Sequence, residues 1–479
     1  MFDVIVVGAG IVGSLVARKL SGYQLNVMVI EKENDVGNVT SMANSAIVHS
    51  GYDPVPGTLK AKFNVLGNKM YPELCRDLDV HLGMIGSLTV ALYDEQLPLL
   101  KELAERSAVN GVPVELLTPE QVIAMEPNIS RDVKGALYAP TAGIVNPFTL
   151  TVHAMENAVD QGVNLALGEA VEDIKKVNNY FVVKTNKNTY RTKVVINCAG
   201  IYGDKIHSLV EPIDYEIKGR KGQYYVLDHY GSGLVNHVIF PLPSEKGKGI
   251  LVSPTTSGNY IVGPSSEWCD DKDDHSTDKE TLNNVRSQAV AMVPSIPFNQ
   301  VIRVFAGTRP TPSTHDFVIG YAKSDNHFIN ASGIESPGLV SSPAIAEYVV
   351  DELLAKVLPL KKKENWSGKV RPRINPKALS SEERNKLIQE HPEYGTIVCN
   401  CEKVTLGEIL DELNRSVPPQ TIKAMKKRTR AGFGKCQGGF CQFQVMSTLA
   451  KHYHRDLSEI LLDANDSNIC RYATKGEKK

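Results

Sequence analysis

The first 31 residues carry the pattern that most constrains the fold of this chain. The β-branched apolar run "FDVIVV" is followed by glycines in a G-x-G-x-x-G spacing, at Gly8, Gly10 and Gly13. A helical pattern follows, and then a second apolar run that ends at Glu31. In such a unit the first glycine permits a tight turn, the second lets the backbone approach a pyrophosphate, and the third lets the helix pack closely on the strand. The sequence therefore predicts a Rossmann-like dinucleotide-binding unit.

Two further groups of this unit suit a dinucleotide. The N-terminus of the predicted helix "IVGSLVARKLSGY" would face the anionic pyrophosphate. Glu31 lies about 20 residues after the glycines, where a carboxylate can accept hydrogen bonds from ribose hydroxyls. The motif alone does not choose between NAD and FAD. Because no second G-x-G-x-x-G stands in a strand–turn–helix setting, one dinucleotide that receives electrons from a small substrate is the simpler interpretation.

Two later segments predict a return to the nucleotide-binding fold. "VVINCAG" is an apolar strand pattern that ends at Ala199 and Gly200, and "HFINASGIESPGLVSSPAIAEYVVDELL" has the order strand, glycine-rich turn, helix. The second segment could bring another helix N-terminus near the cofactor. We therefore expect α/β and α+β architecture: a discontinuous Rossmann-like domain with inserted segments that form a mixed-sheet substrate domain.

The C-terminal part differs from the rest in composition. "LPLKKKENWSGKVRPRINP" has the character of a linker, and Ser380 to Glu383 form a capping box at the start of a predicted short helix. From Lys361 onward the chain has 23 Lys and Arg residues against 14 Asp and Glu residues, about +9, whereas the remainder carries about −10. The asymmetry indicates a separate C-terminal module, with a solvated basic face as the alternative.

Length, charge and hydropathy limit the class of protein. A chain of 479 residues predicts two or three domains. The net charge of −1 gives no reason to expect a nucleic-acid partner. No run of 18 or more apolar residues is present, so we expect no direct membrane span. The first strand begins at Phe2 and leaves no room for a signal peptide, so we expect a cytoplasmic protein with reduced thiols.

Four of the eight cysteines stand in two short clusters, C-x-C at Cys399 and Cys401 and C-x4-C at Cys436 and Cys441. Four thiolates satisfy a 2Fe-2S cluster, two for each iron. Structural zinc is the alternative, although it more often takes C-x2-C spacing, and the spacing alone leaves both open. Five basic residues lie near these cysteines in the sequence and could offset the negative charge of a cluster: Lys426, Lys427, Arg428, Arg430 and Lys435.

Several of these motifs resemble a known family. "GAGIVG…EK", "ANSAIVHSG", "INCAG" and "GIESPGLVSSPAIAEY" are similar to the FAD-dependent oxidoreductases of the D-amino-acid-oxidase type, whose subgroup nearest in pattern contains glycerol-3-phosphate dehydrogenases. "CNCEKVT" with "RTRAGFGKCQGGFC" resembles the C-terminal domain in the large subunit of anaerobic glycerol-3-phosphate dehydrogenases, which is of the bacterioferritin-associated-ferredoxin-like (BFD-like) 2Fe-2S type. "VHSGYDPVPGTLKAKF" also resembles L-2-hydroxyglutarate oxidases.

The resemblance implies a division of the chain. Residues 1–358 would form the FAD-dependent oxidoreductase, residues 359–378 the linker, and residues 379–479 a small, mainly helical, 2Fe-2S-binding domain. Within the first part, the FAD-binding segments would be about 1–80, 140–210 and 305–358, and the substrate-domain segments about 81–139 and 211–304.

The resemblance also implies which residues contact FAD. Ser336, Pro337 and Gly338 would face the pyrimidine end of the flavin, where the backbone amides of Ser336 and Gly338 would stabilise negative charge, with a tight turn that binds no ligand as the alternative. The full expected set is Gly8, Gly10, Ile11, Val12, Gly13, Glu31, Lys32, Thr40, Ser41, Asn44, Ser45, Val171, Ala199, Gly200, Gly333, Ser336, Pro337, Gly338 and Leu339.

Two residues are candidates for catalysis and substrate binding. His49 follows the loop "TSMANS" and could take the proton of a substrate hydroxyl, with a structural histidine as the alternative. The segment with Arg309 resembles an A-G-x-R-P turn of the family, which implies that Arg309 would hold a carboxylate or phosphate of the substrate, with a surface arginine as the alternative. Lys221, with its neighbours Lys218 and Arg220, could add positive charge to the substrate site, or these residues could form a solvated turn.

These expectations combine into one functional hypothesis. The resemblance implies a dehydrogenase of a small anionic alcohol, foremost sn-glycerol 3-phosphate, in which hydride passes to FAD and single electrons leave through a 2Fe-2S cluster. The acceptor would be a partner redox protein or a membrane-associated subunit, so any membrane attachment would be indirect. The alternatives are a 2-hydroxy acid such as L-2-hydroxyglutarate, or an amino acid, as substrate. An alternative of another class is a C-terminal zinc or redox-sensing interaction module.

Overall fold

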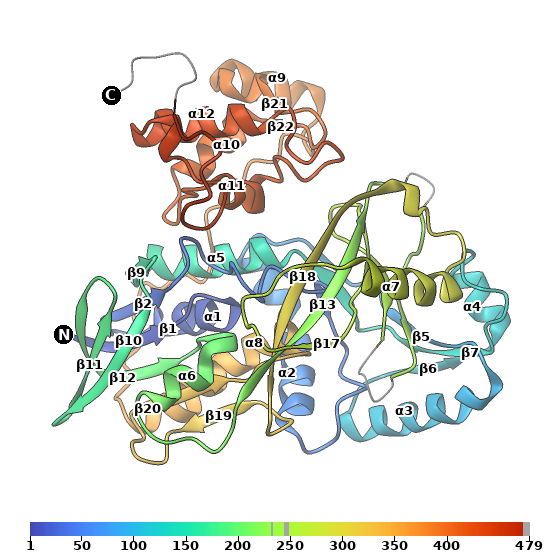
Figure 1. Ribbon diagram of the computed structural model, residues 1–479, viewed down its shortest axis with the longest axis horizontal. Helices are drawn as coiled ribbons and strands as arrows, with labels where there is room; N and C mark the ends of the chain where they lie inside the picture. Colours follow the sequence, from blue (N-terminus) through green and yellow to red (C-terminus); the bar gives the residue numbers. More distant parts are fainter. Residues whose placement is uncertain (231–232, 244–248, 473–479) are drawn as a thin grey trace.

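The computed structural model describes residues 1–230, 233–243 and 249–472. Figure 1 shows a larger body, drawn in blue to yellow, and a small C-terminal domain in orange and red that lies against one side of it. The larger body contains two main sheets, one of eight strands and one of nine. The expected combination of α/β and α+β architecture is confirmed.

The first sheet has a parallel centre. Its strands run in the order β9 (Asn164–Leu167), β2 (Val27–Glu31), β1 (Phe2–Val7), β12 (Thr189–Asn197) and β20 (Phe328–Ser332). Strands β10 (Val171–Val177), β11 (Tyr180–Thr185) and β19 (Val318–Tyr321) add antiparallel pairs. Because β20 lies more than 100 residues after β12 in the chain and still pairs with it, the nucleotide-binding fold is discontinuous, as the sequence predicted.

Helices cover one face of this sheet and a hairpin covers the other. Val4 and Val6 of β1 point to a core shared with α1 (Ile11–Leu20), α5 (Pro147–Asp160) and α8 (Gly338–Glu347). Ile5 and Val7 point the opposite way, toward the β10–β11 hairpin and α6 (Gly203–Ser208). Since side chains alternate along a strand, the continuous apolar run of β1 reflects burial on both faces.

The second sheet is mixed and forms most of the substrate domain. Its order is β17 (Glu267–Cys269), β13 (Ile217–Leu227), β16 (Tyr260–Gly263), β15 (Leu251–Pro254), β14 (Val238–Pro241), β5 (Ser87–Ala91), β7 (Gly135–Ala139) and β6 (Glu115–Leu117). Strands β14 and β5 are parallel. Packed with this sheet are α3 (Leu97–Asn110), α4 (Pro119–Met125) and α7 (Lys279–Met292).

The ninth strand of this sheet departs from the expected division. Strand β18 (Val301–Pro312) pairs antiparallel with β13 from Val301 to Pro312. Residues 305–312, which the sequence assigned to the FAD-binding part, therefore lie in the sheet of the substrate domain. The physical reason is the ladder with β13, which continues until the chain turns toward β19.

A small third sheet and one long helix join the two main sheets. Strands β3 (Ile47–Val48), β8 (Gly143–Val145) and β4 (Leu82–Gly83) form this third sheet. Helix α2 (Leu59–Asp77) packs against α8, where the Cβ of any residue other than glycine at position 67 would lie 2.0 Å from the carbonyl oxygen of Val340. Helix α8 continues as a π-helical segment, Tyr348–Leu353.

The C-terminal domain has its own apolar core. It contains α9 (Ser381–Glu390), β21 (Ile397–Cys399), β22 (Val404–Thr405), α10 (Leu406–Leu413), α11 (Ile422–Thr429) and α12 (Gln442–Tyr453). The predicted capping box is confirmed: Ser380 Oγ accepts from the Glu383 amide, and the Glu383 carboxylate accepts from the Ser380 amide. Residues 473–479 of the expected domain lie outside the described part of the chain. Among the described residues, no helix is both long and apolar enough to cross a membrane.

Candidate active site and cluster site

A cavity of about 800 Å³ is lined by residues of both the nucleotide-binding and the substrate domain. It gathers fourteen of the residues that the sequence singled out. They are Gly10, Ile11, Val12, Thr40, Ser41, Asn44, Ser45, His49, Gly200, Arg309, Ser336, Pro337, Gly338 and Leu339. Segments from the beginning, middle and end of the oxidoreductase part therefore meet around one space, which is large enough for an organic cofactor and a small substrate.

The glycines beside this cavity lie so close to neighbouring backbone that no side chain would fit there. Gly8 has φ of +104°, and a Cβ there would lie 2.4 Å from the carbonyl oxygen of Cys198. A Cβ at Gly13 would lie 2.0 Å from the carbonyl oxygen of Gly8. The amide of Ile11, at the start of α1, donates to Ser41 Oγ at 2.9 Å. This glycine turn and helix N-terminus have the shape and polarity that a pyrophosphate requires.

Glu31 secures the same turn from the end of β2. Its buried carboxylate accepts hydrogen bonds from the amides of Ala9 (2.6 Å) and Glu33 (2.9 Å). Burial raises the pKa of the Glu31 carboxyl, because desolvation outweighs these two hydrogen bonds. The remaining lone pairs are suited to the ribose hydroxyls of a dinucleotide. The residues therefore fit FAD at this end of the site.

Seven of the expected FAD contacts lie outside the cavity lining: Gly8, Gly13, Glu31, Lys32, Val171, Ala199 and Gly333. Gly8, Gly13 and Glu31 shape the turn beside the cavity. Lys32 Nζ lies 4.3 Å from the centre of the Tyr202 ring and 3.5 Å from Asp273 Oδ1. Val171 begins β10, and the direct contact expected for it stays a prediction.

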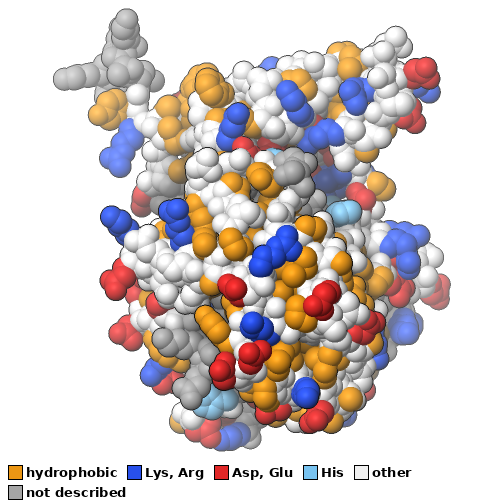
Figure 2. All heavy atoms as spheres, turned by 90° about the vertical axis from the view of Figure 1, so that its right-hand side faces the viewer, with side chains coloured by type: hydrophobic (Ala, Val, Ile, Leu, Met, Phe, Trp, Pro, Cys, Tyr) orange, Lys and Arg blue, Asp and Glu red, His pale blue; other side chains and the backbone are white. Residues whose placement is uncertain are grey.

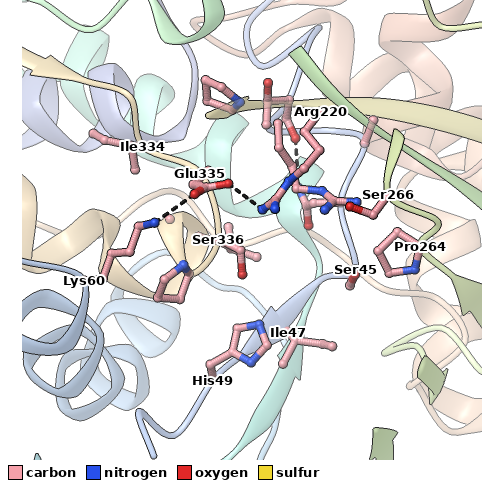
Figure 3. A pocket seen from close by; sticks show the side chains of 18 of the residues that line it. Ser45, Ile47, His49, Lys60, Arg220, Pro264, Ser266, Ile334, Glu335 and Ser336 are labelled. Carbon is pink, nitrogen blue, oxygen red and sulfur yellow. Dashed lines mark hydrogen bonds and ion pairs between the residues drawn. The ribbon is translucent and has the colours of Figure 1, made fainter. Parts of the chain in front are cut away.

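His49 stands directly after β3, at the wall of the cavity. The carbonyl oxygen of His49 accepts hydrogen bonds from the side-chain amides of Asn64 (2.8 Å) and Asn68 (3.1 Å), both on α2. Its ring lies 5.7 Å from the ring of Phe240, centre to centre. Figure 3 shows the imidazole on the side of the cavity opposite Arg220 and Glu335. The backbone of this histidine is therefore fixed by α2, and its ring faces the space where a substrate would lie.

A network of charges lines the far wall. Glu335 accepts from Lys60 Nζ (2.8 Å), from Arg220 Nη2 (2.7 Å) and from Thr311 Oγ1 (2.8 Å). Figure 3 shows Lys60 and Arg220 reaching this carboxylate from opposite sides. Burial would raise the pKa of the Glu335 carboxyl, but the charges of Lys60 and Arg220 lower it below its usual value. The carboxylate of Glu335, the residue that directly precedes Ser336 in the sequence, therefore holds two cations at the cavity.

Arg309 supplies a third cation to this wall. Its Nη2 donates to the carbonyl oxygen of Ser265 at 2.6 Å, and burial lowers the pKa of its guanidinium. Among the described residues no carboxylate forms an ion pair with Arg309. The expected A-G-x-R-P turn is wrong, because the segment lies within β18, where Arg309 is opposite Arg220 of β13. A partly buried guanidinium with remaining donors is suited to an anionic ligand.

Lys221 does not line the cavity. Its Nζ donates to Asp274 Oδ2 at 2.7 Å, on the other side of β13 from Arg220. Neighbouring residues of a strand point to opposite faces, so only one of the two can face the substrate. The sequence reasoning missed Lys60 and Glu335 and gave Arg220 only a secondary place. No signal in the local sequence could have revealed them, since their pairing depends on β13, α2 and the Ser336 turn coming together.

The four cysteines of the C-terminal domain form two pairs. Cys401 Sγ lies 3.6 Å from Cys436 Sγ, and the thiol of Cys441 hydrogen-bonds to Cys399. Among the described residues, no three His, Cys, Asp or Glu side chains converge as ligands of one metal ion. Two pairs of sulfurs can supply two thiolates to each of two iron atoms. The residues therefore fit a 2Fe-2S cluster.

Backbone amides surround the inner pair of sulfurs. The hydrogen bond from Cys441, together with amides that include those of Gly432 and Glu402, outweighs the effect of burial and lowers the pKa of the Cys399 thiol to about 5. The same interaction raises the pKa of Cys441. Cys399 and Cys441 are each only 1% exposed, whereas Cys401 is exposed. The outer pair therefore marks the edge of the site nearest to solvent.

The basic residues near the cysteines have other partners than expected. Lys427 and Arg428 pair with Asp35 of the nucleotide-binding domain, at 2.7 Å and 2.9 Å. Arg430 pairs with Glu402 at 2.8 Å. Lys435 is exposed beside Cys436. The expectation that all five offset the charge of a cluster is thus wrong for Lys427 and Arg428, which hold the two domains together.

Comparison with known proteins agrees with this geometry. A relative called glycerol 3-phosphate dehydrogenase, from Caloramator mitchellensis, is 47% identical over 478 residues and covers 100% of both chains. A glycerol 3-phosphate oxidase from Mycoplasma genitalium is 36% identical and covers 76% of this chain and 97% of its own length. The solved structure of L-alpha-glycerophosphate oxidase from Mycoplasma pneumoniae with FAD bound has a TM-score of 0.75 and 32% identity, covering 78% of this chain and 99% of that one.

Two family models divide the chain in the same way as the fold. The model of FAD dependent oxidoreductases matches residues 3–352, and the model of the BFD-like [2Fe-2S] binding domain matches residues 397–451. The first match covers both main sheets and the cavity, and the second covers all four paired cysteines. The chain therefore belongs to the FAD-dependent oxidoreductase family and carries a BFD-like [2Fe-2S] binding domain at its C-terminal end.

Proposed function

We propose that this protein oxidises sn-glycerol 3-phosphate to dihydroxyacetone phosphate and passes the electrons from FAD through its 2Fe-2S cluster to a partner acceptor. The observation that carries the proposal is the single cavity that joins the flavin-binding segments to His49 on one wall and to three cations on the other. A small alcohol with a phosphate at one end matches this arrangement of base and cations.

The cations would orient the substrate by its phosphate. Arg309 has a partly buried guanidinium whose Nη2 also contacts a backbone carbonyl, and Arg220 and Lys60 are held in place by Glu335. A guanidinium fork recognises phosphate by paired, charge-assisted hydrogen bonds. With the phosphate at this wall, the hydroxyl on carbon 2 would point toward the opposite wall, where His49 lies.

His49 would act as the general base. A neutral imidazole within hydrogen-bond reach of a hydroxyl can accept its proton as carbon 2 is oxidised. Bound FAD supplies the two-electron acceptor for the hydrogen that leaves this carbon. The two side-chain amides that hold the His49 carbonyl would keep the imidazole at a constant distance from the substrate.

The C-terminal domain favours dehydrogenase over oxidase activity. The relative named as an oxidase covers 76% of this chain, whereas the relative named as a dehydrogenase covers all of it. A one-electron cluster provides an exit for electrons other than oxygen. We propose an electron-acceptor protein, or a membrane-associated redox subunit, as the recipient, and a cytoplasmic location as the sequence predicted.

Anaerobic bleaching of the flavin tests the substrate. We expect sn-glycerol 3-phosphate to bleach the flavin of the purified holoenzyme, and glycerol, L-2-hydroxyglutarate and amino acids to do so far more slowly. Glycerol is the matched control, because it has the same carbon chain without the phosphate. Faster bleaching by L-2-hydroxyglutarate would replace the proposed substrate by a 2-hydroxy acid, and equal rates with glycerol would show that the cations do not bind the phosphate.

A further inference from the structure

The exposed edge of the cluster site carries two large apolar side chains. Phe440 is 85% exposed and Phe443 is 62% exposed. Phe440 directly precedes the buried Cys441, and Phe443 lies two residues after it, in the first turn of α12. Exposure of this extent is unusual for aromatic side chains on a soluble domain, and clustered apolar groups at a functional edge are characteristic of interaction sites.

The charges around these phenylalanines have one sign. In the segments 397–403 and 434–444 the only exposed charged side chains are Lys403 and Lys435. Lys403 lies two residues after Cys401, and Lys435 directly precedes Cys436, whose sulfur is 3.6 Å from that of Cys401. Glu402, the only acidic residue in these segments, is buried and paired with Arg430. Figure 2 shows that Lys and Arg also outnumber acidic side chains on the visible face of the C-terminal domain.

The opposite side of the cluster loop is occupied. Phe433 stacks on Phe148 of α5 with ring centres 5.6 Å apart, and Gln437 Oε1 accepts from Arg303 Nη1 at 3.1 Å. One side of the loop therefore contacts the oxidoreductase part, and the side with Phe440 and Phe443 faces solvent. An electron that has reached the cluster can leave to another protein only by the exposed side.

We propose that Phe440 and Phe443, flanked by Lys403 and Lys435, form the docking surface for an acidic electron-accepting protein. The inference rests on the proposed function for the direction of electron flow, and on these four side chains for the location and charge of the contact. Aromatic side chains at the centre of an interface supply affinity, and complementary charge at its rim raises the association rate. A membrane surface fits less well, because anionic lipid is recognised by clusters of about four to eight basic residues, and this edge has two.

Binding of a small acidic redox protein tests the proposal. An acidic [2Fe-2S] ferredoxin serves as the probe and basic cytochrome c as the control of opposite charge, each titrated against the full-length holoenzyme. We expect the ferredoxin to bind and its affinity to fall as salt rises from about 0.02 to about 0.5 M, because exposed charges are screened. In stopped flow, reduced ferredoxin should lose one electron as the oxidised cluster gains one.

Two double variants locate the contact. The variants Phe440→Ala/Phe443→Ala and Lys403→Glu/Lys435→Glu should each weaken ferredoxin binding by about tenfold or more. The effect of the lysine changes should vanish at high salt. Lys386→Glu on α9 and Val109→Ala on α3 are matched controls, since both side chains are exposed and neither belongs to the segments 397–403 and 434–444. Iron content and substrate-driven flavin bleaching should stay unchanged in Phe440→Ala/Phe443→Ala and in the controls, and the binding by Lys403→Glu/Lys435→Glu is compared per bound iron.

Several outcomes would overturn the proposal. They are equal affinity of the two double variants and the wild type, tighter binding of cytochrome c than of ferredoxin, and binding to vesicles of anionic lipid that depends on the two phenylalanines. Because the binding measurement itself uses neither glycerol 3-phosphate nor turnover, it can fail while the proposed substrate is correct. Conversely, failure of the substrate in flavin bleaching leaves the binding result intact.

Discussion

Arg428 of α11 donates two hydrogen bonds to Asp35, from Nη1 to Oδ2 and from Nη2 to Oδ1, each at 2.9 Å. Lys427 Nζ lies 2.7 Å from the same carboxylate. All three side chains are buried. Asp35 belongs to the loop that follows β2 and continues to Thr40 and Ser41 at the cavity. A buried ion triad therefore joins the cluster domain to the loop that contacts the flavin site.

This contact is one of several between the two parts. Arg373 of the linker pairs with Glu156 of α5 and with Glu412 of α10, and Trp366 Nε1 donates to Ser21 Oγ at 3.0 Å. The segment 359–378, expected as a linker, is thus packed against both domains. Together with the Phe148–Phe433 stack, these contacts hold the C-terminal domain against the oxidoreductase part.

Asp35→Asn should loosen the C-terminal domain. Removing one partner of a buried ion pair leaves uncompensated charge and costs roughly 3–5 kcal/mol. We expect faster proteolysis within residues 359–378 and slower reduction of the cluster by the flavin, with iron content unchanged. Asp214→Asn is the control, because that carboxylate forms an exposed pair with Lys323, and such pairs contribute about 1 kcal/mol or less. Equal rates of proteolysis in the wild type and Asp35→Asn would show that the other contacts are sufficient to hold the two domains together.

The same ion triad predicts how the contact between the C-terminal domain and the oxidoreductase part depends on pH. Burial would raise the pKa of the Asp35 carboxyl, but the charges of Arg428 and Lys427 outweigh it and hold this pKa well below its usual range. An unfolded aspartate has a pKa of about 3.9. The stabilisation is therefore complete above about pH 4 and is lost as the pH falls further toward the folded pKa. Resistance to proteolysis should stay constant from neutral pH to about pH 5. A loss of resistance between pH 5 and 7 would mean that a titratable group other than Asp35 determines the stability of the contact between the domains.

Arg309→Ala should impair substrate capture more than FAD binding. Loss of one charged partner in a desolvated site costs on the order of 2–4 kcal/mol, or roughly 30- to 1000-fold in kcat/KM. Arg309→Lys should restore little if the contact is bidentate. Steady-state kinetics and flavin content measure the two effects separately. Lys218→Ala, on an exposed side chain of β13, is the control, and an unchanged kcat/KM in Arg309→Ala would remove this residue from the substrate site.

Arg220→Ala and Lys221→Ala separate two neighbours on one strand. Arg220 lines the cavity and pairs with Glu335, whereas Lys221 pairs with Asp274 outside the lining. We expect Arg220→Ala to lower kcat/KM by roughly 10- to 150-fold, since a hydrogen bond to a charged group contributes about 1.5–3 kcal/mol. Lys221→Ala should change it by about twofold or less. The reverse order of effects would mean that β13 presents its other face to the substrate.

Cys436→Ser should remove the cluster without unfolding the oxidoreductase part. Serine is a poor replacement for a thiolate ligand, and the two main sheets have their own cores. Iron content should fall, and sn-glycerol 3-phosphate should still bleach the flavin in a single turnover. Transfer to the natural acceptor protein should fall sharply, whereas a small dye that reaches the flavin would mask the defect. Normal transfer to that protein in a variant without iron would mean that the cluster has only a structural role.

Features that depend on neighbours in the sequence could be predicted without the structure. The turn at Gly8, Gly10 and Gly13 is local, because the spacing of the glycines itself decides which backbone can form. The capping box at Ser380 is complete within four residues. The two cysteine clusters predict four sulfur ligands, and this prediction does not depend on where the C-terminal domain packs. For the same reason the discontinuous fold was predictable, since each of its βα segments carries its own pattern.

Features that depend on register or on distant segments were decided only by the tertiary structure. The sequence places Arg220 and Lys221 side by side, and the pairing of β13 with β18 determines that Arg220 faces the cavity and that Arg309 lies opposite it. Asp35 and Arg428 are 393 positions apart, and nothing near either residue indicates the other. A strand alternates its faces with every residue, and a buried charge requires a partner from whichever segment packs against it, so these relationships arise only when the chain is folded.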